Sequence, residues 1–182
     1  MDKKKTIVYS HDTVEFVTVA AEFCGYVEGA QGRNRKDFIN TILKLFPLLY
    51  LKASLLKAVE VEEDFYPETF VTEQDYEYLR TSIAAVMGEH DDYLDLCNED
   101  VRFSDEPMMK SISEDIADVY QAVRNFVETY RIGIEENMFG AVAEIEQSFQ
   151  LYWGQTLVNA MRALHRCKGM QEEDDDLYND AE

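Results

Sequence analysis

Glycine and proline are scarce in this chain, which has eight glycines and three prolines among its 182 residues. Both residue types interrupt regular structure, and together they usually supply roughly 12% of a protein. Few turn residues in a chain of this length indicate few connections, and therefore long elements. We predict that these elements are helices, because no segment of useful length shows the two-residue period of a strand.

Cysteines and long apolar runs are also few. Cys24, Cys97 and Cys167 form no CxxC pair, and their odd number argues against a disulfide framework. We expect each to be a small apolar filler on a helix. No run approaches the ~20 apolar residues of a membrane-spanning helix, and no signal-peptide stretch follows the charged start. The sequence therefore predicts a cytoplasmic protein.

Basic residues are also few relative to acidic ones. The chain has 17 lysines and arginines against 37 aspartates and glutamates, giving a net charge of −20. Such a charge repels nucleic-acid phosphates and anionic lipid, so we expect no nucleic-acid partner and no membrane-surface binding. It permits a basic protein partner, or bound cations.

Familiar catalytic and cofactor motifs are missing as well. The sequence has no phosphate-binding GxxxxGK[ST] loop, no GxGxxG, no HExxH and no GxSxG. The acidic run from Asp91 to Asp100 lacks the central glycine of a calcium-binding EF-hand loop. With three histidines and no cysteine cluster, a dedicated zinc site is not expected.

Helical periodicity is present throughout most of the chain. Apolar residues at three- and four-residue spacing predict five long helices, at about 13–30, 35–59, 73–97, 111–133 and 138–168. Asp12 with Glu15, Thr72 with Asp75, and Ser111 with Glu114 resemble capping boxes, and Asn34 is the expected cap of the second helix. We predict an all-α, single-domain helical bundle over residues 1–170. Residues 171–182 are predicted to be an acidic, disordered tail.

The predicted second helix is unusually apolar. From Ile42 to Leu51 it is hydrophobic on nearly every side, and such a helix is normally buried. It should therefore lie at the centre of the bundle or at a subunit interface. A homodimer through residues 35–59 is thus possible. Pro47 removes a backbone hydrogen bond inside this helix and should kink it.

Asp115 and Asp118 are one candidate metal site. They are three residues apart, so they share a helix face beside the apolar stripe. Two carboxylates near a core can bind Mg²⁺ or Mn²⁺ through oxygen. The alternative is an exposed first turn, where acidic residues simply suit the helix dipole.

His90, His165 and Glu22 are the other candidates. Both histidines fall on the apolar stripes of their predicted helices, where each would need a polar partner. A histidine beside a carboxylate suits metal binding or acid–base chemistry, but such a residue is more often a satisfied core histidine or lies at the solvent-exposed end of the stripe. Glu22, if it points inward, needs a counter-charge such as Arg124 or Arg162; if it points outward, it has no special role.

Two known helical enzyme types match this sequence only in part. All-helical nucleotide pyrophosphohydrolases carry an ExxE motif followed by ExxD, and Glu89-xx-Asp92 of this chain matches the second of these motifs. The paired ExxH motifs of di-iron bundles are absent. The tail has two interpretations of its own, since Leu177 and Tyr178 among the acids could dock into a basic groove or the tail could simply maintain solubility.

Three segments resemble a bacterial all-helical domain-of-unknown-function family, DUF5063. They are 113–120 (SEDIADVY), Trp153-Gly154 with 160–165 (AMRALH), and the stretch from Phe16 to Cys24. The resemblance implies a helical bundle in a bacterial cytoplasm and no assigned activity. Members of that family often have more histidine around the Trp-Gly pair, where this chain has Tyr152 and Gln155.

The sequence thus favours a non-enzymatic protein-interaction module of the bacterial cytoplasm. The missing motifs, the charge of −20 and the acidic tail motivate this hypothesis. The alternative is a metal-dependent, phosphohydrolase-like enzyme. It would use Asp115, Asp118, Glu22 and one of the two histidines, with Mg²⁺ or Mn²⁺ as a possible cofactor, and those groups would have to converge in one cleft.

Overall fold

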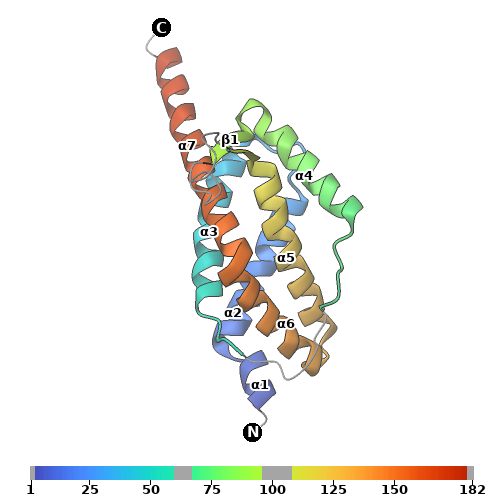
Figure 1. Ribbon diagram of the computed structural model, residues 1–182. Coiled ribbons are helices and arrows are strands. Elements are labelled where there is room, and N and C mark those ends of the chain that lie inside the picture. Colours follow the sequence, from blue (N-terminus) through green and yellow to red (C-terminus); the bar gives the residue numbers. More distant parts are fainter. Residues whose placement is uncertain (1–2, 60–66, 96–107, 180–182) are drawn as a thin grey trace.

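The chain folds into one upright bundle of helices (Figure 1). The structure, a computed structural model, describes residues 3–59, 67–95 and 108–179, with the backbone alone for residues 171–179. The elements, in chain order, are α1 (Lys3–Val8), α2 (His11–Glu28), α3 (Arg35–Ser54), α4 (Glu73–Met87), the 3₁₀ turn η1 (Gly88–His90), β1 (Asp92–Asp95), β2 (Met108–Ser111), α5 (Ile112–Ile132), α6 (Glu135–Ser148), the π-helical turn η3 (Phe149–Trp153) and α7 (Gly154–Asn179). This confirms the predicted all-α class and bundle.

Helix α5 is central, because it packs against α2, α4, α6 and α7. Helix α3 packs against α2 and against α7. The core between them is rich in aromatic rings. The ring centroid of Phe16 in α2 lies 5.2 Å from that of Phe126 in α5 and 6.3 Å from that of Trp153. The ring centroids of Phe23 and Phe46, the latter in α3, are 5.5 Å apart. Aromatic pairs at such separations contribute packing beyond the area they bury.

Most predicted helix starts are confirmed by their caps. The Asn34 side chain accepts a hydrogen bond from the Asp37 amide, and Thr72 and Asp75 form a complete capping box. Ser111 accepts from the Glu114 amide at the start of α5. Helix α2 differs, because Ser10, and not Asp12, is its cap, so the helix begins two residues earlier than predicted.

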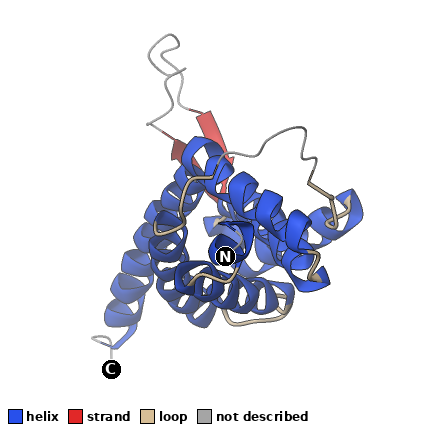
Figure 2. Cartoon of the chain, turned by 90° about the horizontal axis from the view of Figure 1, so that it is seen from below, coloured by secondary structure: helices blue, strands red, loops and turns tan. Residues whose placement is uncertain are grey.

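The region after Met87 corrects the third predicted helix. Gly88 adopts a φ of 59°, which a residue with a side chain rarely tolerates, and α4 ends there. The chain then forms strand β1, which pairs antiparallel with β2. The expectation of no strands was therefore wrong, and Leu94 is exposed on the hairpin. The two strands lie outside the helices in the view along the bundle (Figure 2).

Helix α3 corrects the expectation of an all-round buried helix. Ile42, Phe46 and Leu49 are fully buried, but Leu48 and Leu51 are 41% and 52% exposed. One face of α3 therefore carries leucines that the bundle does not cover. The second possibility given by the sequence, a subunit interface, is left open by this arrangement. The helix also ends earlier than predicted, at Ser54.

The last predicted helix is divided in two. A π-helical turn over Phe149–Trp153 separates α6 from α7, immediately before Gly154. Helix α7 then continues to Asn179, so its backbone extends into the predicted acidic tail and projects beyond the other helices (Figure 1). Cys97 lies outside the described residues, as do residues 98–107. Within the described part, no helix is long and apolar enough to cross a membrane.

Candidate functional sites

Asp115 lies at the first turn of α5, where the β1–β2 hairpin covers it. Only 4% of Asp115 is exposed, and the Tyr93 hydroxyl of β1 donates a short hydrogen bond to its carboxylate. The hairpin is anchored nearby, because Asp91 accepts hydrogen bonds from the amide and the hydroxyl of Ser113 at 2.8 and 2.6 Å. The expectation of an exposed first turn is thus wrong for Asp115.

Burial makes Asp115 a weaker acid than usual. Removal of water from the carboxylate raises its pKa from 3.8 to about 6, although the Tyr93 hydrogen bond and the charge of Lys110 partly oppose the shift. The neighbouring charges of Asp118 and Glu114 raise it further. Asp115 therefore changes charge close to neutral pH, which is a common property of functional carboxylates and also of buried structural ones.

We expect the Asp115 carboxyl to titrate with a midpoint near pH 6, and the midpoint to move upward in Tyr93→Phe. The reason is that the tyrosine hydroxyl stabilises the ionised form by donating to it. Carbon-detected NMR of the side-chain carboxyl measures both midpoints. A wild-type midpoint near 4 would show that the site is not desolvated as described.

The stability of the fold should follow the same titration. A folded-state pKa above the unfolded value adds stability that is complete below pH ~4 and is lost as the pH rises through ~6. The unfolding free energy of the wild type, relative to Asp115→Asn, should therefore fall by at most about 3 kcal/mol between pH 4 and pH 7. Urea denaturation at several pH values checks this, and a difference that rises with pH would contradict it.

The other four candidate residues do not gather around Asp115. Asp118 is exposed and accepts a hydrogen bond from Tyr76 at 2.7 Å, and His90 is half-buried in η1, 3.7 Å from Glu89. His165 is exposed on α7, and Glu22 is exposed on α2. In the described part of the chain, these five residues contain no group of three whose ligand atoms lie within 4.8 Å of one another. The metal-ligand role of this set stays a prediction.

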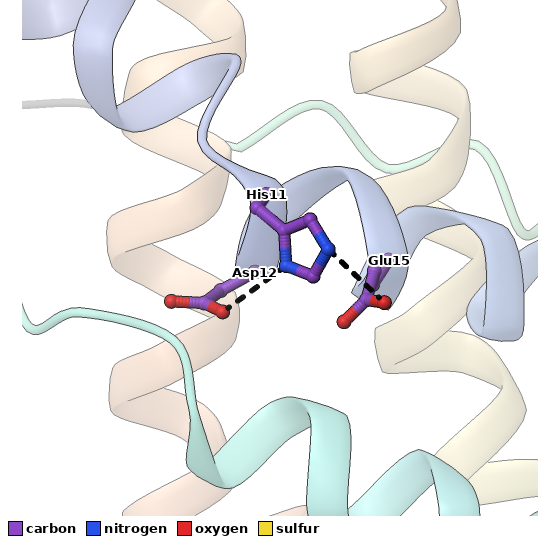
Figure 3. Close-up of side chains that lie close together, drawn as sticks. All are labelled: His11, Asp12 and Glu15. Carbon is purple, nitrogen blue, oxygen red and sulfur yellow. Dashed lines mark ion pairs between the residues drawn. The ribbon is translucent and has the colours of Figure 1, made fainter.

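A different cluster, which the sequence analysis did not single out, has the spacing of metal ligands. His11, Asp12 and Glu15 lie on the first turn of α2 with their ligand atoms within 4.8 Å (Figure 3). His11 Nδ1 is 3.7 Å from Asp12 and its Nε2 is 3.4 Å from Glu15. Glu15 is also paired with the Lys52 ammonium at 2.6 Å, which lowers the pKa of the glutamate. The cluster is therefore explained as an ion-pair network on the surface.

A charged cavity of about 490 Å³ lies between α2, α4 and α5. Its wall holds Glu128, which is 8% exposed and paired with Arg124 at 2.8 Å and with Arg131 at 2.6 Å. Tyr120 and Arg124 both contact Glu28, so the charges on this wall compensate one another. Three carboxylates, of Glu28, Asp75 and Glu128, nearly balance the guanidinium groups of Arg124 and Arg131, which gives little attraction for a charged ligand.

A second cavity, of about 540 Å³, lies between α3 and α7, and we call it the α3–α7 groove. His165 was predicted to lie on the apolar stripe of the last helix, but the groove itself was not predicted, since helix pairing cannot be read from periodicity. Its lining is partly apolar and partly basic, and consists of Asn40, Leu43, Lys44, Val158, Met161, Arg162, His165 and Lys168. In a chain with a net charge of −20, this is an unusual concentration of positive charge.

The exposed leucines of α3 continue this groove along the helix. Leu48, Leu51 and Leu55 are 41%, 52% and 45% exposed, and they follow Lys44 at steps of four, three and four residues. That spacing places all of them on one face of a helix. Tyr50 and Phe149 touch at 5.0 Å, so the far half of α3 lies beside the η3 turn that precedes α7. The two helices are therefore antiparallel neighbours.

The fold and these sites define a small helical-bundle domain, and comparison with known proteins gives its family. The family described as a domain of unknown function, DUF5063, matches residues 7–169. The chain therefore belongs to this family, as the resemblance in three segments predicted. The match covers the bundle and ends where the predicted tail begins.

A solved crystal structure is similar over most of the chain. It is the crystal structure of protein BF1032 from Bacteroides fragilis, a structural-genomics target, with a TM-score of 0.79 and 44% sequence identity. The similarity covers 89% of this chain and 95% of that one. No curated protein matches the sequence.

Proposed function

We propose that this chain is a non-enzymatic protein-interaction module, and that its partner binds in the α3–α7 groove. The observation that carries the proposal is the leucine stripe of α3, which leaves Leu48, Leu51 and Leu55 about half exposed beside the groove. Contiguous apolar patches rimmed by polar residues mark interaction sites on soluble proteins. A groove between two helices with an apolar stripe suits a partner helix, which would insert residues at three- and four-residue spacing.

The charges of the groove define the chemistry of the partner. Lys44, Arg162, His165 and Lys168 line it together with Leu43, Val158 and Met161. A complementary segment therefore combines acidic side chains with a few apolar ones. Such complementarity favours correct partners over wrong ones and speeds encounter more than it adds affinity.

Affinity capture with matched variants tests this proposal. The full-length chain is immobilised as wild type, as Leu48→Lys/Leu51→Lys and as Val14→Lys, and each is exposed to the same cell extract. Val14 is 45% exposed on α2, so its substitution changes an exposed apolar residue outside the groove. We expect a partner that the wild type and Val14→Lys retain and that the double variant loses.

The captured partner must also have the expected chemistry. Its binding segment, located by cross-linking, should be acidic and amphipathic. Retention of the same proteins by the wild type and the double leucine variant would contradict the proposal. Melting curves of all three forms serve as the control for folding.

A basic protein partner, expected from the net charge, stays a second prediction. The surface that supports it is the acidic end of the bundle around the start of α5, where Asp91, Asp92, Glu114 and Asp118 lie near the cations Arg80 and Lys110. A partner of this kind would be released as salt screens the attraction. Recovery of the chain without a basic partner at every salt concentration would count against it.

The metal-dependent enzyme remains the alternative, with Asp115 and Asp118 as its nearest pair of carboxylates. A bound Mg²⁺ or Mn²⁺ must stabilise the folded state, by ~2.7 kcal/mol at a hundredfold excess over its dissociation constant. Thermal unfolding of chelator-treated protein with each metal measures this. A selective rise that Asp115→Asn abolishes would support the enzyme, and no rise with either metal would remove it.

A further inference from the structure

We infer that the α3–α7 groove of one copy binds the acidic end of α7 from a second copy, and that the two copies form a symmetric dimer. This inference specifies the partner of the groove and so rests on the proposed function. It starts from the length of α7, which runs from Gly154 to Asn179 and projects beyond the bundle (Figure 1). The groove involves α7 only as far as Lys168. About eleven further helical residues, at 1.5 Å each, provide roughly 16 Å of helix beyond it.

The two halves of α7 have opposite charge. The half in the bundle carries Arg162, His165, Arg166 and Lys168, whereas the projecting half carries five consecutive acids, from Glu172 to Asp176. Each half also contributes apolar residues, Val158 and Met161 in the first, and Leu177 and Tyr178 in the second. A helix with this asymmetry is complementary to an antiparallel copy of itself.

An antiparallel pair also has a consistent register. If Leu177 of the second copy lies against Met161, then Asp176 lies opposite Arg162 and Glu173 opposite His165, because each step forward on one helix is a step back on the other. These positions share one helix face, since they are separated by three or four residues. Both halves of the contact are then the same, as a two-fold symmetric interface requires.

The two-fold axis of this register passes at Gly169. Gly169 is exposed, and a side chain placed there would have no neighbour within 4 Å in the single copy. A glycine at the crossing point lets two helix backbones approach closely. Beyond the axis, the bundle of each copy lies beside the projecting helix of the other, so the two bundles occupy opposite ends of the helix pair.

The net charge of −20 on each copy opposes association, and the inference requires local pairing to exceed this repulsion. At an ionic strength of about 0.15 M, charges more than ~8 Å apart are largely screened, whereas contacts in the groove are not. The apolar contact of Met161 with Leu177 of the other copy is insensitive to this repulsion. Experiments at this ionic strength are therefore the appropriate test.

Charge reversal with rescue tests the dimer. The mass of the full-length chain in solution is measured by light scattering over a range of concentrations, for the wild type and for Arg162→Glu/His165→Glu. The like-charge contacts occur twice by symmetry, and at a few tenths of a kcal/mol each they should raise the dimer dissociation constant about tenfold. Adding Glu173→Lys/Asp176→Lys to the same chain should restore the dimer.

The control changes the same charge elsewhere. Lys57→Glu/Gln147→Glu alters two exposed residues outside the groove by the same total charge, and should leave the dissociation constant within about threefold of the wild type. A monomeric wild type at all concentrations, or a dimer that the groove variant does not weaken, would overturn the inference. The proposed function would survive either result if the capture experiment identified a different acidic chain in the groove.

Discussion

Replacing Gly154 with alanine is expected to lower the free energy of unfolding by about 3 kcal/mol, the upper part of the range for forcing extra atoms into a packed site. A methyl group at this position would lie 2.5 Å from the carbonyl oxygen of Phe149 and 2.9 Å from two carbons of its ring. The oxygen belongs to the π-helical turn that joins α6 to α7 and accepts from the Gly154 amide. Relief of the clash therefore requires that turn to move. Urea denaturation of Gly154→Ala against the wild type measures the loss.

Gly25→Ala is the matched control for this substitution. Gly25 lies within α2, is exposed, and has open space where a methyl group would be placed. Alanine stabilises an open helical position by up to ~1 kcal/mol relative to glycine. The two substitutions should therefore change stability in opposite directions. A stabilised Gly154→Ala would show that the π-helical turn adapts at little cost.

The substitution Phe16→Ala should be the most damaging of all, with a loss of about 3–5 kcal/mol. Phe16 is fully buried and contacts the rings of both Phe126 and Trp153. Its removal would leave a cavity where α2, α5 and the η3 turn meet, and the surrounding rings cannot collapse into it fully. Chemical denaturation with two independent probes, near-UV and far-UV circular dichroism, gives the value.

Val14→Ala on the same helix provides the comparison. Val14 is 45% exposed, so its truncation should change stability by no more than ~0.5 kcal/mol. Equal losses at the two positions would mean that α2 does not present the face to the core that its apolar spacing indicates. A small loss at Phe16 would place the centre of the core elsewhere.

Local signals in the sequence predicted the helices well. Asn34, Thr72 and Ser111 are caps because their short polar side chains bond amides that the helix itself leaves unpaired, and this chemistry depends only on residues nearby in the chain. The distinctive Trp-Gly pair of the family also has a physical explanation. Gly154 is required by the close approach of Phe149, while Trp153 donates to the Ile145 carbonyl inside the core.

The errors arose where contacts between distant residues decide the structure. His90 and Leu94 continue the helical spacing of the stripe that ends at Met87, but pairing of Asp92–Asp95 with Met108–Ser111 makes that segment a strand. Asp115 is buried because Tyr93 and the hairpin cover the first turn of α5, and nothing near Asp115 in the sequence indicates such a cover. His90 was predicted to lie on an apolar helix face, but α4 ends at Met87 and His90 lies in the η1 turn.

The α3 helix shows most clearly what periodicity leaves undecided. Its apolar residues extend around most of the helix, and the sequence offered either a central position or an interface. The structure buries Ile42, Phe46 and Leu49 against the bundle and leaves the leucines on the opposite side exposed. The groove itself combines residues from α3 and from α7, about 120 positions apart in the chain, so only their packing defines it.

The oxidation rate of Met161 tests the central claim, that the α3–α7 groove is a binding surface, most directly. Met161 lines the groove, whereas Met109 is 60% exposed on the β1–β2 hairpin and serves as a reference within the same molecule. Hydroxyl-radical labelling with mass spectrometry is applied to the free chain and to its complex, with a second copy or with a captured partner. The account predicts that Met161 becomes protected in the complex while Met109 reacts at an unchanged rate. Equal reactivity of Met161 in the free and bound chain would contradict it.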